Sequence, residues 1–381
     1  MIPDLSIRAC LGRARRSTLL TCVGTLLACS QTMAADDALT VHITEGRAAL
    51  PSLDMPGLVT VVDREQIEQS NARNLAELLA GRAGIQLTDL FGDGTQTSVD
   101  MRGFGPTASS NILILVDGRR LNNNSDVAAP AINRVRLDQI ERIEIVRGSA
   151  GVLFGNQAVG GVVNVVTRSA DLDAHYLEGG VGSYQSARAH AGFSRPLGHD
   201  LFLRVAASYR DTDNYRDHNS LRSKDLGLRL EQQYGRGTWF LEGDAANDYQ
   251  QLPGSLFADE VAGDRRQSAP VYARDFSDTD TLTGRLGISH RFNDNWRAQG
   301  EATWRREDRE FITSFRTFPG QPATQDRETW TLNPRLVGNV GEGASLTLGL
   351  DYEPTDYVLE TQFGPQKVDQ KIWGIYGQTS V

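Results

Sequence analysis

The stretch that decides the fold of this chain is Gln139–Arg168, which reads QIERIEIVRGSAGVLFGNQAVGGVVNVVTR. Its first part alternates isoleucine with charged residues from Ile140 to Ile145, and its last part is an apolar run after Gly160-Gly161. Period-two runs bounded by glycine are typical of β-strands, and glycine at such breaks allows a positive φ or a close backbone approach. We therefore predict two strands joined by a glycine-containing turn. An ordinary hairpin of a soluble α/β domain has the same alternation, whereas a phosphate-binding loop would need a Gly-Lys-Ser/Thr motif that this stretch lacks.

Four short motifs make the stretch more specific than a generic hairpin. They are Ile140–Glu144 (IERIE), Arg147-Gly148, Phe154-Gly155 and Gly160–Asn164 (GGVVN). In this order they resemble the signature that closes the plug domain of TonB-dependent outer-membrane receptors. Ser149 stands where that family commonly has proline, and Phe154 where it commonly has tyrosine. The resemblance implies a small mixed α/β plug domain followed by the antiparallel strands of a transmembrane β-barrel.

The composition limits the classes of function. The chain has 381 residues, of which 39% are hydrophobic, enough for more than one domain. Its formal net charge of -9 argues against a nucleic-acid partner, which would require a basic surface. The three cysteines are Cys10, Cys22 and Cys29, so removal of the N-terminal segment would leave no disulfide and no thiolate metal site. The sequence shows no histidine spacing typical of metal ligands and no triad context for an enzyme.

The N-terminus has the layout of a cleaved secretory signal, which we assign to residues 1–35. Basic residues precede a neutral to apolar run, Ser17–Ala28, and the small residues Ala34 and Ala35 offer a cleavage site. The run is too short for a membrane-spanning helix. Two alternatives stay open, a lipoprotein site at Cys29 and twin-arginine export through Arg15-Arg16. A barrel must cross the inner membrane unfolded, which argues against twin-arginine export.

Residues 36–44 form a short alternating run after the expected cleavage site, a pattern that a frayed terminus can also show. The family resemblance gives this run the role of a TonB box, which pairs as an added strand with the periplasmic protein TonB and so couples to its inner-membrane energising complex. Strand addition suits the run, because main-chain hydrogen bonds supply affinity and alternate side chains set the register. The expected TonB-binding residues are Leu39, Thr40, Val41, His42 and Ile43.

Residues 45–168 are expected to form the plug. Asp63 is a candidate N-cap for a helix that runs towards Gly81. The expected strands are Leu58–Val62, Ser98–Phe104, which resembles the family's IRG strand, and Asn111–Val116 before an Asp117-Gly118 turn.

Three charged residues, Arg102, Glu144 and Arg147, lie within these otherwise apolar plug elements. A solvated strand face would account for one isolated charge. The resemblance implies instead that Arg102 and Arg147 face acidic groups on the inner barrel wall. Such pairs would hold the plug without fixing it permanently, because desolvation offsets the attraction of a buried pair. We therefore predict that these three residues take part in plug–barrel gating.

From residue 175 to residue 381 the pattern changes to repeated segments with one apolar and one polar face, such as Leu201–Tyr209 and Trp296–Trp304. A soluble β-sandwich also alternates, but the segment length and the export signal favour a transmembrane barrel. We expect about ten strands here, whereas a barrel that holds a plug needs about 22, so the chain is expected to be truncated. Long polar outer loops are expected at 211–223, 245–280, 307–325 and 353–369.

The ligand site is expected at the plug apex and in the outer loops, where arginine and aromatic side chains can meet an anionic chelate. The candidates are Phe91, Phe104, Arg265, Arg266, Tyr272 and Arg274. We expect no resident cofactor. Oxygen-bearing residues at Asp211, Asp213, Asn214 and Asp217 could ligate Ca²⁺, although such a cluster is more often a turn-rich loop.

These features favour TonB-dependent active uptake of a scarce chelated nutrient across the outer membrane of a Gram-negative bacterium, and the protein is not expected to be an enzyme. A ferric siderophore or another iron chelate is the first substrate class and cobalamin is the alternative. A non-functional truncated receptor fragment is the second alternative. A passive porin or adhesin would need no plug, so residues 45–168 speak against that class.

The mass of the protein in its native outer membrane tests the expected truncation. Mass spectrometry should find a product well above the 41.7 kDa of this sequence, because an open set of strands leaves unpaired edges in lipid. A stable membrane product that ends at Val381 would exclude a barrel of about 22 strands and require a smaller or an oligomeric one.

Overall fold

The computed structural model describes most of the chain after residue 58. The described residues are 59–72, 74–89, 96–123, 129–130, 132–150, 154–168, 174–341 and 344–380, together with the strand backbone at 42–43 and 50–51. The chain divides after Thr40 into two compact units, and the fold below belongs to the unit Val41–Val381. No helix in the described ranges is long and apolar enough to cross a membrane. The expected signal segment 1–35, Leu39–Val41 and Phe91 lie outside the described residues.

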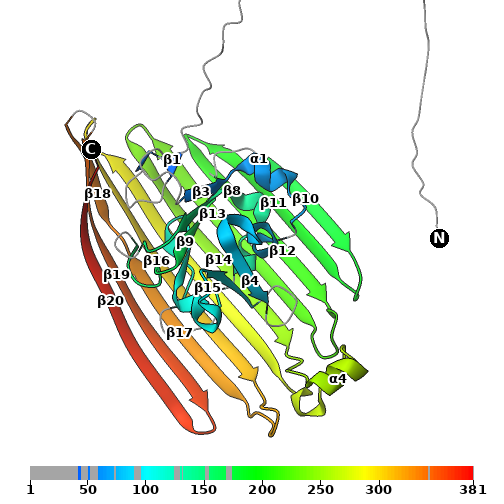
Figure 1. Cartoon of the computed structure of the whole chain (residues 1–381). Coiled ribbons are helices and arrows are strands. Elements are labelled where there is room, and N and C mark those ends of the chain that lie inside the picture. Colours follow the sequence, from blue (N-terminus) through cyan, green and yellow to red (C-terminus); the bar gives the residue numbers. More distant parts are fainter. Residues whose placement is uncertain are drawn as a thin grey trace, which may run out of the picture. The chain divides into compact units, whose positions relative to one another are not determined.

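Small sheets and short helices make up the plug (Figure 1). The larger sheet has the strand order β3-β8-β9-β6-β7, in which β6 and β9 are parallel and the other neighbours are antiparallel. The strands are β1 (His42–Ile43), β2 (Leu50–Pro51), β3 (Val59–Val62), β4 (Ile85–Asp89), β5 (Thr97–Met101), β6 (Ile112–Val116), β7 (Arg119–Arg120), β8 (Ile140–Arg147) and β9 (Gly161–Thr167). The helices are α1 (Arg64–Gln69), α2 (Leu75–Leu79), η2 (Arg82–Gly84), η3 (Gly105–Ser110), η4 (Ile132–Arg134) and η5 (Leu137–Gln139).

The two strands predicted in the fold-determining stretch are confirmed. Ile140, Ile143 and Ile145 are fully buried, and β8 pairs antiparallel with β9, whose Val163 and Val165 are also fully buried. Burying a branched aliphatic side chain of this kind contributes about 1.5–3 kcal/mol. The two strands are therefore the centre of the plug core.

The single helix expected from Asp63 to Gly81 is wrong, because the structure has two helices there. Asp63 does cap α1, with its Oδ1 accepting from the Gln66 amide at 2.8 Å. However, Ser70 is extended at ψ 148° and Asn74 caps α2 by accepting from the Glu77 amide at 2.8 Å. Serine and asparagine side chains compete for backbone hydrogen bonds and so favour caps over helix interiors.

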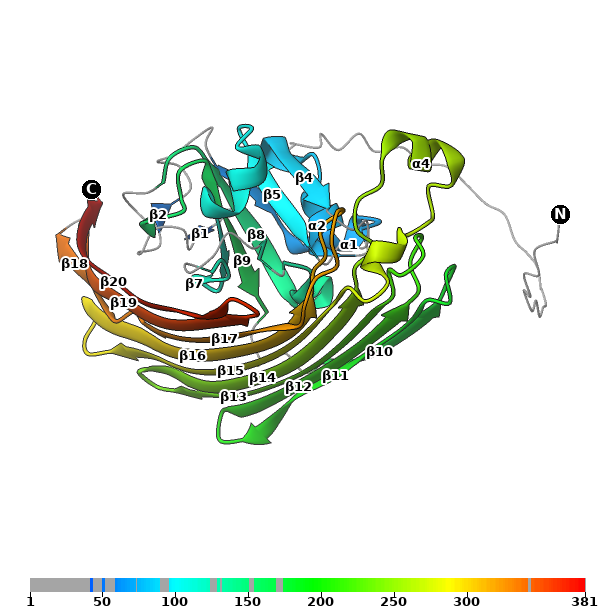
Figure 2. The ribbon, with the colours of Figure 1, turned by 90° about the horizontal axis from the view of Figure 1, so that it is seen from below.

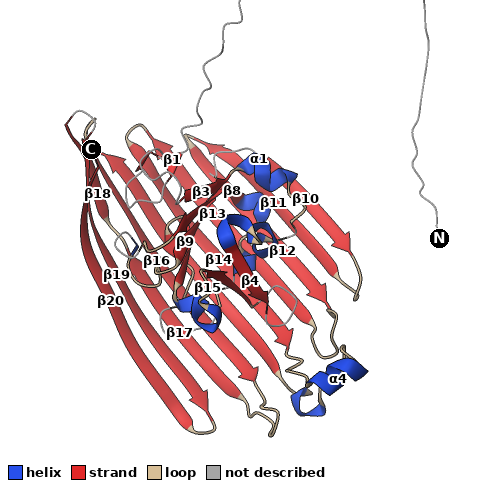
Figure 3. Ribbon diagram, viewed as in Figure 1, coloured by secondary structure: helices blue, strands red, loops and turns tan. Residues whose placement is uncertain are grey.

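The second part of the unit is a wide antiparallel sheet that runs from β10 to β20 (Figure 3). Figure 2 shows the sheet curving around the plug, which lies on its concave side. The strands are β10 (Ala174–Val181), β11 (Ala187–Gly198), β12 (Leu201–Thr212), β13 (Leu221–Tyr234), β14 (Gly237–Gln251), β15 (Phe276–Arg291), β16 (Trp296–Ile312), β17 (Ala323–Leu332), β18 (Arg335–Gly341), β19 (Ala344–Thr361) and β20 (Gly364–Ser380).

The expectation of about ten strands is confirmed, because β17 and β18 act as one strand. Both pair with β16 on one side and with β19 on the other. The break between them falls at Asn333-Pro334, and the β17–β19 register skips Glu353 and Pro354 nearby. Proline cannot donate to a strand ladder, so prolines on both strands interrupt the hydrogen bonding at this point.

The outer face of the sheet is apolar in its middle. Leu203, Leu230, Leu241, Leu286 and Ala302 lie directly opposite one another on β12 to β16. Leu241 is 50% exposed and Leu286 is 54% exposed. A soluble sheet would cover such a row, whereas a membrane barrel presents it to lipid.

The long polar outer loops are shorter than expected. Strand β12 continues to Thr212 and β16 to Ile312, and the stretch 353–369 belongs almost entirely to the β19–β20 hairpin. Polar side chains do not prevent a backbone ladder, so strands can extend beyond the apolar band. The connection 252–275 remains long and contains α4 (Ala258–Gly263) and η6 (Pro270–Tyr272).

Substitution of Gly161 by alanine should destabilise the plug locally. A Cβ at Gly161 would lie 2.5 Å from Met101 Cε and 2.6 Å from the Val146 carbonyl oxygen, and the backbone atom cannot move away freely. Such overpacking costs about 1–3 kcal/mol. Hydrogen exchange followed by mass spectrometry should therefore show faster exchange in β8 and β9 of Gly161→Ala. Gly235→Ala is the matched control, because nothing lies within 4 Å of its added Cβ. Unchanged exchange in the Gly161 variant would contradict this packing.

Candidate functional site

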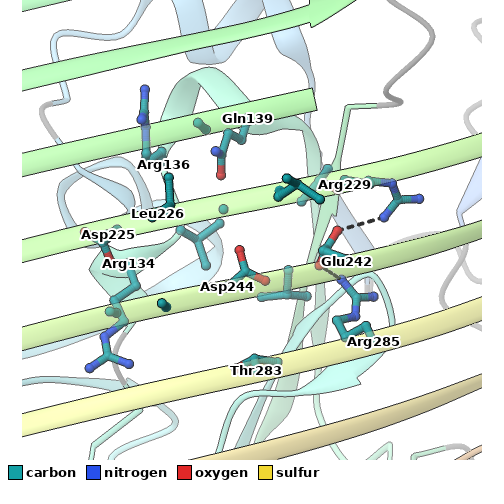
Figure 4. A pocket seen from close by; sticks show the side chains of 18 of the residues that line it. Arg134, Arg136, Gln139, Asp225, Leu226, Arg229, Glu242, Asp244, Thr283 and Arg285 are labelled. Carbon is teal, nitrogen blue, oxygen red and sulfur yellow. Dashed lines mark hydrogen bonds and ion pairs between the residues drawn. The ribbon is translucent and has the colours of Figure 1, made fainter. Parts of the chain in front are cut away.

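A row of charged residues crosses the inner face of the sheet. Arg204, Arg229, Glu242 and Arg285 lie directly opposite one another on β12 to β15. Arg285 Nη1 donates to Glu242 Oε1 at 2.5 Å, and Arg229 Nη1 donates to Glu242 Oε2 at 2.9 Å. Figure 4 shows Glu242 between these two guanidinium groups. The row is one residue out of phase with the apolar outer row, so the pleat of the sheet separates charge from lipid.

Arg285 is the most deeply buried member of this row, with a side chain that is 3% exposed. Besides Glu242, it donates from Nε to Glu301 Oε1 at 2.8 Å, and its Nη1 lies 3.9 Å from Asp117 Oδ2 of the plug. Removing one partner of a buried charge is strongly destabilising, because the remaining charge stays uncompensated. Glu242 and Glu301 are therefore needed to compensate the buried charge of Arg285.

The plug contacts this wall through arginine side chains from the segment between β7 and β8. Arg134 donates from Nε to Asp248 Oδ2 and from Nη1 to Thr281 Oγ1, at 2.8 and 2.9 Å. Burial of the Arg134 guanidinium opposes its charge, but the Asp248 carboxylate outweighs that effect and raises the pKa of Arg134. The neighbouring Asn133 accepts from the Ala76 amide at 3.0 Å, so η4 links the wall to helix α2.

Further polar contacts join plug and wall on either side of Arg134. Arg136 Nη1 donates to the Ala207 carbonyl at 3.3 Å, and Arg204 Nη1 donates to the Arg168 carbonyl at 2.7 Å. Arg120 of β7 lies 3.9 Å from Glu353 of β19. The plug is thus held to the wall by hydrogen bonds and ion pairs that span several strands.

A cavity of about 180 Å³ lies between the plug and strands β12 to β16. Its plug side includes Asp117, Arg119, Arg134 and Gln139, and its wall side includes the charged row described above. In Figure 4, Arg134 of η4 and the two carboxylates Glu242 and Asp244 of β14 lie around this space. The cavity thus lies at the boundary between the plug and the wall, and charged side chains of both line it.

Comparison with known proteins decides the family. Residues 51–162 match the family model described as the TonB-dependent Receptor Plug Domain. Residues 51–162 are therefore a plug domain of the TonB-dependent receptor family. The architecture agrees, because a plug of this kind is followed here by antiparallel strands with an apolar outer face and a charged inner face.

Curated relatives and a solved structure support the same family. The vitamin B12 transporter BtuB of Vibrio vulnificus is 31% identical over 177 residues, which cover 46% of this chain and 28% of the relative. BtuB of Vibrio cholerae is 26% identical over 378 residues, which cover 96% of this chain and 50% of the relative. The ferripyoverdine receptor of the outer membrane of Pseudomonas aeruginosa, bound to ferripyoverdine, has a TM-score of 0.70 at 17% identity, and the match covers 88% of this chain and 50% of that one. The receptor sequence thus spans at most half the length of these relatives.

The residues predicted for gating, Arg102, Glu144 and Arg147, are not among the plug residues described above at the wall. Glu144 is fully buried and accepts from Arg142 Nε at 2.8 Å and from Asn164 Nδ2 at 2.9 Å, both within the plug. Arg102 and Arg147 are exposed, and Arg102 has a positive φ of 75°. Their gating role stays a prediction. Plug arginines that contact the described wall include Arg120, which follows the Asp117-Gly118 turn, and Arg134 and Arg136, which belong to no motif in the sequence.

Of the predicted ligand residues that the structure describes, two aromatic residues pack inside the protein and three arginines are exposed. Tyr272 is 4% exposed and its ring lies against Gly254, so it supports the long outer loop. Phe104 is half-buried and packs against the plug core. Arg265, Arg266 and Arg274 are exposed, and the Arg266 guanidinium lies 5.6 Å from the Tyr215 ring centroid. These arginines are the part of the predicted set that can meet a ligand from outside.

Sequence reasoning missed the residue that organises this outer loop. Arg216 donates to the Gly254 carbonyl at 2.5 Å and to the Gln267 carbonyl at 2.8 Å, so it ties the two ends of the loop together. The nearby candidates for calcium binding have protein partners, since Asp211 accepts from Tyr209 and Arg222 and Asp213 accepts from Gln185. Within the described ranges, no group of three or more acidic or histidine side chains is arranged to hold a metal ion.

Substitution of Glu242 by alanine should destabilise the receptor far more than loss of an exposed acid. It leaves Arg229 and Arg285 without a shared carboxylate, and breaking a buried ion pair costs about 3–5 kcal/mol. Urea unfolding of the purified receptor, followed by circular dichroism, measures this free energy. Glu178→Ala is the matched control, because it breaks an exposed pair with Arg188 at 3.1 Å that is worth less than about 1 kcal/mol. Equal losses in both variants would contradict the role given to Glu242.

Proposed function

We propose that the receptor takes up a scarce chelated nutrient across the outer membrane, with energy supplied through TonB. The observation that carries this proposal is the way the plug is seated. Every residue of its two buried apolar clusters belongs to the plug itself. Hydrogen bonds and ion pairs attach it to the wall. A domain with its own core and a polar interface can shift against its neighbour without exposing that core.

Part of the expected TonB box, residues 39–43, is an extended strand. His42 and Ile43 form β1, which pairs antiparallel with Pro51 and Leu50 of β2. An extended segment that pairs through its backbone suits strand addition to another protein. We infer that residues 39–43 bind TonB in this manner.

Two substrate classes have support of different kinds. The curated relatives are named vitamin B12 transporters, which favours cobalamin. The exposed Arg265, Arg266 and Arg274 favour an anionic ligand, and the structural neighbour that binds ferripyoverdine shares the fold. We keep a ferric siderophore or other iron chelate as the first class and cobalamin as the second, and uptake assays distinguish them.

Substitution of Val41 by proline should abolish uptake and leave ligand binding intact. Proline removes one backbone donor and cannot complete a strand ladder, so pairing with TonB should fail. The assay measures binding and accumulation of radiolabelled ferric siderophore, and separately of radiolabelled cobalamin, by cells that produce the full-length receptor.

The control is Val41→Ala, which keeps the backbone donor and should retain most of the uptake. Full uptake by the proline variant would contradict energy coupling through this segment. Accumulation of neither ligand by the unsubstituted receptor would contradict both substrate classes and favour the non-functional alternative.

A further inference from the structure

Two arginines at the boundary between plug and wall have no carboxylate within ion-pair distance among the described residues. Arg119 of β7 and Arg305 of β16 both line the large cavity and also a second cavity of about 20 Å³ beside it. Among the described residues, neither forms an ion pair with a carboxylate, and Arg305 instead donates to the neutral side chain of Asn123. Burying cations without counter-charge is costly.

The surroundings increase this excess of positive charge. The large cavity is lined by seven arginines but only by the four carboxylates of Asp117, Asp225, Glu242 and Asp244. Glu242 is already shared between Arg229 and Arg285. Burial, together with the charges of Arg285 and Arg305, lowers the pKa of Arg119 to about 10, although Glu242 and Glu301 act in the opposite direction. The site is therefore electrostatically incomplete.

Unused hydrogen-bond donors lie in the same place. Arg119 Nε and Arg285 Nη2 are buried and have no hydrogen-bond partner among the described residues, and the Arg285 side chain is only 3% exposed. The second cavity adds hydroxyl groups from Thr303, Thr329 and Thr355, and its carboxylate, Glu353, lies 3.9 Å from Arg120. Buried donors of this kind are normally satisfied, and a charged donor left unsatisfied is especially costly.

We propose that a small inorganic oxyanion, of the size and charge of sulfate or phosphate, binds between Arg119 and Arg305 at the boundary of plug and wall. A guanidinium fork matches the paired oxygens of such an anion. The cavity volume of about 180 Å³ exceeds what one water needs by roughly tenfold, so an anion and its waters fit. The anion would bridge a plug residue to a wall residue. This role is separate from the transported nutrient and does not depend on its identity.

Equilibrium dialysis with radiolabelled sulfate tests the proposal on the full-length receptor, purified in non-ionic detergent at constant ionic strength with chloride as the balancing anion. We expect saturable binding of one sulfate per chain, with unlabelled phosphate as a competitor. Arg119→Gln should weaken binding by about tenfold or more, because it removes the charge and most of the donors. Arg297→Gln, which alters an exposed arginine at the start of β16, should bind as the unsubstituted receptor does.

Arg119→Lys guards against a folding defect, because it keeps the charge and should retain intermediate binding. Folding of each variant is checked by its heat-modifiable migration in detergent gels. Absence of saturable sulfate binding in the unsubstituted receptor would overturn the proposal. Equal binding by folded Arg119→Gln would place any anion elsewhere and would also overturn it.

Discussion

The pairing of Arg285 with Glu242 and Glu301 is the constraint on which the arrangement of the wall depends. These charges are buried on the concave face, and they are tolerated only because each has a partner. A slip of one residue in any strand would turn its charged residue towards lipid and its leucine towards the plug. The ion pairs and the apolar outer row therefore specify the same register from opposite faces.

The plug obeys a different rule. Its strands β8 and β9 bury apolar side chains on both faces, and its core clusters contain plug residues alone. The wall supplies polar contacts such as Arg134 with Asp248, which fix position more than they add stability. A plug that has its own apolar core and is attached by polar groups is suited to movement, which is what the proposed transport requires.

The charge balance at the boundary is uneven. Glu242 and Asp248 pair with the arginines nearest to them, whereas Arg119 and Arg305 line both cavities and form no ion pair among the described residues. An anion bridge would complete this boundary without adding a permanent covalent or apolar link. Release of the bridge would need only exchange with water and ions.

The sequence by itself determined the family, the plug strands and the number of barrel strands. Motifs such as IERIE and GGVVN, and period-two alternation, are local patterns, so β8, β9 and the alternation in β12 were predictable. It did not determine where polar strands end, because a backbone ladder can continue through polar residues beyond the apolar band, as β19 and β20 do. Nor did it separate α1 from α2, although Asp63 and Asn74 each cap one of the two helices.

The tertiary structure alone decided which arginines meet the wall. Arg134 stands next to no motif, and its partner Asp248 lies far along the chain, so only the folding of plug against sheet brings these charges together.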